Sequence, residues 1–294
     1  MPHIPFYLDD RPAYFGGFKR DYAESDFALF GVPFDGTSSY RPGSRFGPDA
    51  IREASANIET WSWRTGTDFE ELRLHDLGNL AVVHGDAGET IRRVGDTVED
   101  IVSTRKIPIM VGGEHLMTLG AAKAIKGCTF VSFDAHFDLR DEYLSNRLSH
   151  ACVMRRVMEE EGKDRVIFCG VRATFGEELR WVKENGIKFM TSRDLLREGT
   201  KSSSSWLREA LKGSEKVYIT IDMDVIDPSY APGVGNPEPE GIHPSLLLDM
   251  LQEVIDERVV GFDIVEVAPK YDMGITALLA SKMIFEICTM MKRK

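Results

Sequence analysis

Residues 217–228 read Val-Tyr-Ile-Thr-Ile-Asp-Met-Asp-Val-Ile-Asp-Pro, and this stretch decides the class of fold. Its first five residues are apolar or β-branched, a composition typical of a strand in the interior of a sheet. Asp222 and Asp224 follow this run, and Asp227-Pro228 predicts the turn that ends the strand. The stretch therefore predicts a buried strand with carboxylates at its carboxyl end.

Similar short apolar runs alternate with longer amphipathic stretches along the rest of the chain. We predict strands at residues 27–33, 107–112, 129–133, 166–170, 217–225 and 259–267. We predict helices at residues 48–58, 87–105, 116–125, 151–160, 177–185, 244–257 and 276–291. This alternation with nearly all-apolar strands predicts an α/β fold, a three-layer α/β/α sandwich around a mainly parallel central sheet.

The sequence carries no sign of an internal boundary. No linker rich in Pro, Ser or Gly divides it, and no internal repeat is present. The serine run at residues 202–205 is short and is expected to form a surface loop ahead of a helix near Trp206. We therefore expect a single domain over residues 1–294.

The composition excludes several classes of protein. The chain has 294 residues, with 36 Lys and Arg against 47 Asp and Glu, which gives a net charge of −11 when His is neutral. Hydrophobic residues make up 43% of the chain, too many for a disordered protein, and the glycines lack the period of a collagen. Four Cys are too few for a disulfide scaffold, and we expect them to be buried, reduced thiols.

The charge and the chain ends bear on possible partners. An acidic chain is a poor partner for nucleic acid, since phosphate contacts need a basic face. No apolar run reaches the roughly 20 residues of a membrane span, so no membrane partner is expected. Residues 1–10 lack the basic start and continuous apolar core of a secretory signal, and we expect a cytoplasmic location. The excess acid favours a cationic partner only weakly, because such an excess usually serves solubility.

Histidines and aspartates also follow two other predicted strands. After residues 107–112, Gly113-Glu-His115 would place His115 over the end of the sheet. After residues 129–133 comes Asp134-Ala-His136-Phe-Asp138. Residues two apart on an extended segment point to the same side, so Asp134, His136 and, if the extension persists, Asp138 converge. In open α/β sheets the ligand site lies at these strand ends.

Four aspartates and two histidines at three strand ends point to a metal site. Buried carboxylates repel one another and lose hydration, and a cation offsets both costs. The alternative is a hydrogen-bonded turn with solvated acids. Carboxylates and imidazoles without sulfur suit manganese or a similar divalent ion better than a thiolate zinc site. Two ions about 3.5–4 Å apart would use all six side chains and deliver hydroxide near neutral pH, so hydrolysis is the expected reaction. The six are His115, Asp134, His136, Asp138, Asp222 and Asp224.

One further acid stands near the end of a late apolar strand, in Phe262-Asp-Ile-Val-Glu-Val-Ala-Pro269. Taken alone, Glu266 could simply pair with a Lys or Arg. Beside the other three strand ends, it becomes a candidate for binding a positively charged group of a substrate.

Three of these segments resemble the signatures of the ureohydrolases, the arginase/agmatinase family. They are Gly112-Gly-Glu-His115, Phe133-Asp-Ala-His-Phe-Asp138 and Thr220-Ile-Asp-Met-Asp-Val-Ile-Asp-Pro228. Residues 31–48 and 231–239 extend the likeness, the first of them to the N-terminal segment of agmatinases. Three such motifs in order at these spacings are highly specific. The resemblance implies an arginase-like fold and a homo-oligomer, usually a trimer or hexamer in this family.

The resemblance also implies a role for each candidate residue. His115 and Asp138 would bind one manganese ion and His136 and Asp224 the other, with Asp134 and Asp222 bridging them, so two Mn²⁺ per subunit are implied. Glu266 occupies the place of the glutamate that binds the guanidinium. His150 occupies the place of a loop histidine that shuttles protons or positions substrate. Asp138, close to the bridging hydroxide that attacks the guanidinium carbon, would carry the proton to the departing amine.

The segment before the loop histidine bears on the substrate. Tyr143-Leu-Ser-Asn-Arg-Leu-Ser-His150 lacks the Gly-Asn-Leu-His-Gly motif with which arginases bind the amino-acid end of their substrate. Agmatine, which gives putrescine and urea in polyamine biosynthesis, is the expected small cationic guanidino substrate. N1-aminopropylagmatine, which gives spermidine, comes second, because His150-Ala-Cys replaces the usual His-Gly-Thr or His-Gly-Ser and could admit a longer tail. Guanidinobutyrate and arginine are less favoured, the former because its carboxylate tail wants a basic partner that the sequence does not identify.

Two interpretations from other classes of protein stay open. A deacetylase on a related fold would bind a single zinc and use a tandem His-His pair, and none of the seven His residues are adjacent. A non-catalytic binding protein that kept the fold would be expected to have lost metal ligands, and all six are present. Metal analysis separates these readings from a manganese hydrolase.

Overall fold

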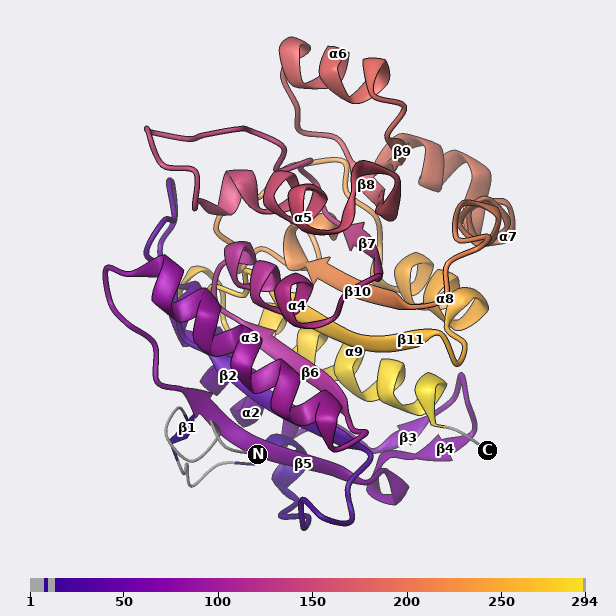
Figure 1. Ribbon diagram of the computed structural model, residues 1–294. Helices are drawn as coiled ribbons and strands as arrows, with labels where there is room; N and C mark the ends of the chain where they lie inside the picture. The colour runs from indigo at the N-terminus through magenta and orange to yellow at the C-terminus, as the bar shows by residue number, and fades with distance from the viewer. Residues whose placement is uncertain (1–7, 10–13, 293–294) are drawn as a thin grey trace.

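The strands of the computed structural model form one large sheet and a small hairpin; the structure describes residues 8–9 and 14–292. The strands of the large sheet are β1 (Leu8–Asp9), β2 (Phe27–Val32), β5 (Leu74–Leu80), β6 (Ile107–Gly112), β7 (Thr129–Phe133), β8 (Val166–Val171), β9 (Lys188–Thr191), β10 (Val217–Asp222) and β11 (Val259–Val265). The hairpin pairs β3 (Trp61–Ser62) with β4 (Thr67–Asp68). The sheet has the order β1-β5-β2-β6-β11-β10-β7-β8-β9, and only the β1 pairing is antiparallel (Figure 1). The prediction of a mainly parallel sheet is confirmed.

Helices cover both faces of this sheet. The helices on one face are α3 (Ala87–Ser103), α4 (Thr118–Ala124), α5 (Val153–Glu161) and α6 (Gly176–Glu184). Those on the other face are α2 (Gly47–Ser55), α7 (Ser192–Ala210), α8 (Pro244–Val254) and α9 (Ile275–Met291). In Figure 1, α3 and α4 cross in front of the sheet and α9 lies behind it. The three-layer α/β/α prediction is confirmed.

Strands β2 and β7 contribute to two separate cores because successive side chains point to opposite faces. Leu29 and Val131 join the core under α2, α7, α8 and α9. Phe30 and Phe130, their neighbours in sequence, join the core under α3 to α6. Every residue of β2, β8 and β10 is buried. Strands that are buried on both faces must be apolar on both faces, which is why the sequence revealed them.

Short 3₁₀ helices occupy several of the connections. They span Phe15–Gly17, Ser44–Phe46, Phe69–Glu71, His115–Met117, His150–Cys152, Lys163–Arg165, Met223–Val225 and Pro269–Tyr271. The one at Met223–Val225 directly follows β10, so this strand ends earlier than a continuous extended chain would. The strand predicted at residues 217–225 ends at Asp222 for this reason.

The polar strand β5 was not predicted. It reads Leu-His-Asp-Leu-Gly-Asn-Leu, and its Asp76 is buried. Asp76 accepts hydrogen bonds from Nε and Nη2 of Arg52 at 2.7 and 2.8 Å. Arg52 comes from α2, so a contact between distant parts of the chain supplies the partner that a buried carboxylate needs. The strand pattern of the sequence contains no sign of this pair.

Helix α7 corrects another expectation. The run at residues 202–205 is not a surface loop but lies within α7, with Ser203 and Ser204 buried. The helix begins with a capping box between Thr191 and Asp194, and Gly199, with φ of 70°, interrupts it. Small serine side chains suit a face that packs closely on β8 and α8. The interruption at Gly199 and the serine run concealed the helical period in the sequence.

Further predictions concern the cysteines, membrane-spanning segments, the N-terminal segment and the number of domains. All four cysteines are free and buried, as expected. Within residues 8–9 and 14–292, no helix combines the length and apolar character needed to cross a membrane. The expected lack of a secretory signal concerns residues 1–10, of which only Leu8 and Asp9 are among the described residues. The single domain over residues 1–294 stays a prediction.

The centre of the sheet places four strand ends side by side. The chain runs from β6 through α4 to β7, and β11 and β10 later fill the space between these two strands. The carboxyl ends of β6, β11, β10 and β7 therefore meet at one edge. In α/β sheets, such an edge is where ligands bind.

Candidate metal centre

The end of β6 is shaped by a close backbone approach at Gly113. A Cβ at this position would lie 1.9 Å from the carbonyl oxygen of Phe34, so only glycine fits. The Gly113 amide donates to the Val32 carbonyl at 2.7 Å, and the Gly113 carbonyl accepts from the Glu266 amide at 2.8 Å. The chain then turns into a 3₁₀ helix at His115, whose side chain is 1% exposed.

The segment after β7 supplies three of the candidate ligands. Asp134 is fully buried, and its Oδ1 accepts from the backbone amide of His136 at 2.6 Å. The extension does not persist as far as Asp138, which has φ of 50°. The resulting bend still brings Asp138 Oδ2 to 3.3 Å from Nδ1 of His115. Asp138 therefore joins the cluster through a turn and not through the alternation that the sequence suggested.

The aspartates of β10 meet in a similar way. Asp222 is the last residue of the strand, and Asp224 lies in the 3₁₀ helix that follows. Asp222 Oδ1 accepts from the backbone amide of Asp224 at 2.8 Å. Asp224 Oδ1 in turn accepts from the backbone amide of Ala135 at 3.0 Å, which ties this turn to the segment after β7.

The structure brings the six residues together as two adjoining groups. His115, Asp134 and Asp138 form the first group, and Asp134, His136 and Asp224 form the second. Within each group, one ligand atom from every residue lies within 4.8 Å of the others. Asp134 belongs to both groups. Asp222 lies beside the first group, with its Oδ2 3.5 Å from Nδ1 of His115.

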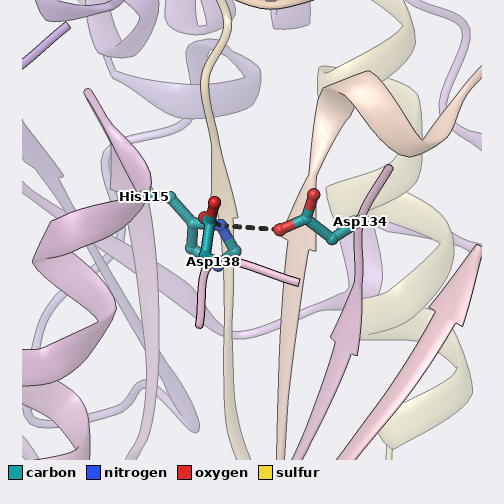
Figure 2. A group of neighbouring side chains, drawn as sticks. All are labelled: His115, Asp134 and Asp138. Carbon is teal, nitrogen blue, oxygen red and sulfur yellow. Dashed lines mark ion pairs between the residues drawn. The ribbon is translucent and has the colours of Figure 1, made fainter. Parts of the chain in front are cut away.

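Oxygen and nitrogen atoms face one another across the groups. Figure 2 shows the carboxylates of Asp134 and Asp138 turned toward the His115 ring. Nδ1 of His115 lies 3.0 Å from Oδ2 of Asp134. In the second group, Nδ1 of His136 lies 3.0 Å from Oδ2 of Asp224 and 3.6 Å from Oδ1 of Asp134.

The buried carboxyl groups of the cluster shift one another's pKa values. Burial and the neighbouring Asp224 and Asp134 raise the pKa of Asp222 well above its usual range, and burial raises the pKa of Asp138 to about 6. Burial opposes charge on Asp134 as well, but His115 and His136 hold its pKa below the usual range. Carboxylates held this close are costly unless cations balance them.

Two unsatisfied atoms show that the cluster suits metal ions. Nδ1 of His115 and Oδ2 of Asp134 are buried and lie 3.0 Å apart, yet neither has a hydrogen-bond partner of good geometry. Buried polar atoms almost always have a partner. A metal cation is one such partner, because it accepts the lone pair of an oxygen or nitrogen atom. Carboxylate oxygens and imidazole nitrogens without thiolate suit hard to borderline divalent ions. The residues present therefore fit a pair of such ions.

A cavity of about 410 Å³ opens onto this cluster. The candidate residues that line it are His136, Asp138, His150, Asp222, Asp224 and Glu266. Its outer part is lined by Tyr40, Tyr143, Phe175, Asn236 and Glu238, which come from loops. Arg140 also lines it, and its guanidinium lies 4.3 Å from the centre of the Phe175 ring. None of these outer residues was predicted, because no strand or helix pattern marks them.

Glu266 lies in this cavity just after β11. It is 7% exposed, has φ of 65°, and accepts the backbone amide of His115 on Oε1 at 2.9 Å. Burial and the nearby carboxyl of Glu114 raise the pKa of Glu266 to about 8. No Lys or Arg in the described part of the chain forms an ion pair with it. The alternative that Glu266 simply pairs with a Lys or Arg therefore does not hold among the described residues.

His150 lies in the wall of the same cavity. Its backbone amide donates to Oγ1 of Thr37 at 2.9 Å, and its ring nitrogens lie 3.3 Å from Oγ1 of Thr37 and from Oγ of Ser39. Burial lowers the pKa of His150 to about 4, so its ring is neutral near pH 7. Thr37 also donates to the buried Glu114 at 2.7 Å. The sequence did not identify Thr37 and Ser39 as partners of His150, although both lie in the segment at residues 31–48 that resembles the agmatinases.

Comparisons of this chain with a family model, with related sequences and with solved structures all point to one family. Residues 25–290 match the model of the Arginase family. The chain is 40% identical over 262 residues to the N(1)-aminopropylagmatine ureohydrolase of Thermococcus kodakarensis, covering 88% of both. It is 36% identical over 276 residues to the agmatinase of Pyrococcus horikoshii, covering 93% of this chain and 94% of that protein. The crystal structure of the agmatine ureohydrolase of Thermoplasma volcanium gives a TM-score of 0.87 at 37% identity, covering 93% of this chain and 92% of that one.

Proposed function

Since this chain belongs to the arginase family and is a hydrolase of carbon–nitrogen bonds, we propose that it converts agmatine and water to putrescine and urea. One observation carries the proposal. The cavity that exposes Asp138, Asp222 and Asp224 also contains Glu266, a buried carboxyl group without a basic partner among the described residues, and a bound cation would favour its charged form. A guanidinium bound by Glu266 would lie in the same space as the candidate metal ligands.

We assign two Mn²⁺ ions to the centre. His115 and Asp138 would hold one ion, His136 and Asp224 the other, and Asp134 and Asp222 would bridge them. The position of Asp134 in both groups supports this assignment. When bound, two divalent ions lower the pKa of water and so supply hydroxide near neutral pH.

Side chains of this protein would bind the substrate and transfer the protons. Glu266 would hold the guanidinium by charge-assisted hydrogen bonds and orient its carbon toward the cluster, which lowers the entropic part of the barrier. Asp138, which lines the cavity, would carry a proton to the departing amine. The neutral ring of His150 would then accept a proton from the cluster and pass it to solvent through the cavity mouth. Urea and a primary amine would leave.

The substrate is tested by urea release from the manganese-loaded protein. We expect kcat/KM to be highest for agmatine among agmatine, N1-aminopropylagmatine, arginine and guanidinobutyrate. The reason is the cationic tail of agmatine, for which the cavity mouth offers Glu238 and the amide of Asn236. A highest kcat/KM with arginine would overturn the choice of substrate.

N1-aminopropylagmatine is the second candidate. The relative from Thermococcus kodakarensis carries that name at 40% identity, and the cavity of about 410 Å³ leaves room for a longer tail. Guanidinobutyrate belongs in the comparison because Arg140 is a basic group in the cavity wall, which the sequence did not identify. Arg140→Met tests its influence, and a rise in the preference for guanidinobutyrate over agmatine would exclude Arg140 as a carboxylate partner.

His150 is expected to assist without being essential for metal binding. We expect His150→Asn to lower kcat about 100-fold, the lower end of what general acid–base groups contribute, and to leave the manganese stoichiometry unchanged. Steady-state kinetics and metal analysis measure the two effects. An unchanged kcat would remove His150 from the mechanism.

The assembly and the location stay predictions. A trimer or hexamer is expected, and light scattering on the purified protein measures the number of subunits. Trp63 and Met273 are among the exposed large apolar side chains and are places to look for subunit contacts. A cytoplasmic location is likewise expected.

A further inference from the structure

A chain of buried hydrogen bonds lies behind His115, on the side away from its three carboxylates. Nε2 of His115 lies 3.0 Å from Oγ1 of Thr220. Thr220 donates to Oδ1 of Asp263 at 2.6 Å, and Thr118 donates to Oδ2 of Asp263 at 3.0 Å. Thr118, Thr220 and Asp263 are completely buried. Neither the metal ligands nor the substrate groups described above include any of these three residues.

The position of Asp263 in the sheet is unusual for a carboxylate. It lies on β11, between β10 and β6, with Thr220 as its register partner on one side and Met110 on the other. A carboxylate at the centre of a sheet is costly because it loses its hydration. The two threonine hydroxyls offset part of that cost, and one of them reaches His115.

Counting hydrogens shows what this arrangement does to the imidazole. A threonine hydroxyl has a single hydrogen, and Thr220 gives its hydrogen to Asp263. The Thr220 oxygen can then only accept from His115, so the hydrogen of a neutral imidazole must be on Nε2. Nδ1 is left with its lone pair directed at the cluster, where it lies 3.0 Å from Asp134 Oδ2.

We propose that Asp263, acting through Thr220, is a positioning residue that fixes the tautomer and ring orientation of His115 for metal binding. The proposal rests on the assignment of His115 as a ligand under the proposed function. Groups that hold the second nitrogen of a ligating histidine typically change metal affinity about 10–100-fold when removed. The effect should be confined to the ion that His115 binds, because no hydrogen bond of the described residues links Asp263 to His136.

The test is calorimetric titration of metal-free protein with Mn²⁺, which does not depend on turnover. We expect Thr220→Val to weaken one of the two binding events about 10–100-fold and to leave the other unchanged. Thr220→Ser retains the hydroxyl and should restore the affinity of the wild type. Thr220→Ala serves the same purpose as Thr220→Val if the bulkier side chain prevents folding, which circular dichroism would reveal.

Thr118→Val is the matched control. It removes a donor from the same buried carboxylate by the same chemical change. Oγ1 of Thr118 lies 3.3 Å from Oγ1 of Thr220, but Thr118 has no hydrogen bond to His115. We expect it to lower the melting temperature about as much as Thr220→Val while manganese affinity stays within about threefold of the wild type. Equal losses of affinity in the two valine variants, or no loss in either, would overturn the positioning role. A wild-type protein that binds fewer than two ions would instead count against the proposed function.

Discussion

Replacing Asp134 with alanine is expected to remove both manganese ions and to lower urea release at least about 1,000-fold, because metal ions contribute several kcal/mol to such reactions. Asp134 is the residue that both groups share, and it is completely buried. Its loss would leave His115 and His136 without the carboxylate that lies 3.0 and 3.6 Å from their Nδ1 atoms. Metal analysis and urea release on the same sample measure the two effects.

A comparison with two other variants makes this prediction specific. His136→Ala removes a member of the second group only and should leave one ion bound. Asp249→Asn changes a surface carboxylate that pairs with Arg64, and metal content and kcat should be unchanged. If Asp134→Ala kept both ions, the shared position of Asp134 would not be a bridging one.

Glu266→Gln is expected to lower kcat/KM for agmatine about 100-fold or more while both ions remain bound. Removing one partner of a buried charge pair typically costs about 2–5 kcal/mol, and each 1.36 kcal/mol is about a factor of ten in rate. Glutamine keeps the size of the side chain and can still accept the backbone amide of His115. The loss would therefore report on the charge that binds the guanidinium.

Glu286→Gln is the control for this variant. Glu286 is a similarly buried glutamate, but it pairs with Ser62 and Lys282 and is not among the residues lining the cavity. In the folded protein, kcat/KM should stay within about twofold of the wild type, as for changes that touch neither substrate nor cluster. An unchanged kcat/KM in Glu266→Gln would mean that another group binds the guanidinium.

The sequence predicted the centre of this molecule well for a physical reason. Strands buried on both faces must be apolar, so β6, β7, β10 and β11 stand out, and any acid at their ends is conspicuous. Parallel strands bring these ends to one edge, which is why the sequence alone predicts that residues as distant as His115 and Glu266 lie close together. Their chemical roles remain predictions.

The parts that the sequence did not predict depend on contacts between distant residues. Strand β5 is polar because Arg52 of α2 pairs with Asp76 within it. The positive φ of Asp138 belongs to a turn and does not follow from alternation along an extended chain. The roles of Thr37, Arg140 and Asp263 do not follow from any sequence pattern, since they come from what lies against these residues in the folded chain.

The central claim is that two metal ions at one cluster supply the chemistry. The most direct test titrates metal-free protein with Mn²⁺ and measures bound ions and urea release from agmatine in the same samples. The account predicts no urea release without metal, and activity that rises to a plateau at two ions per chain. A plateau at one ion, or urea release from protein that holds no metal, would contradict it.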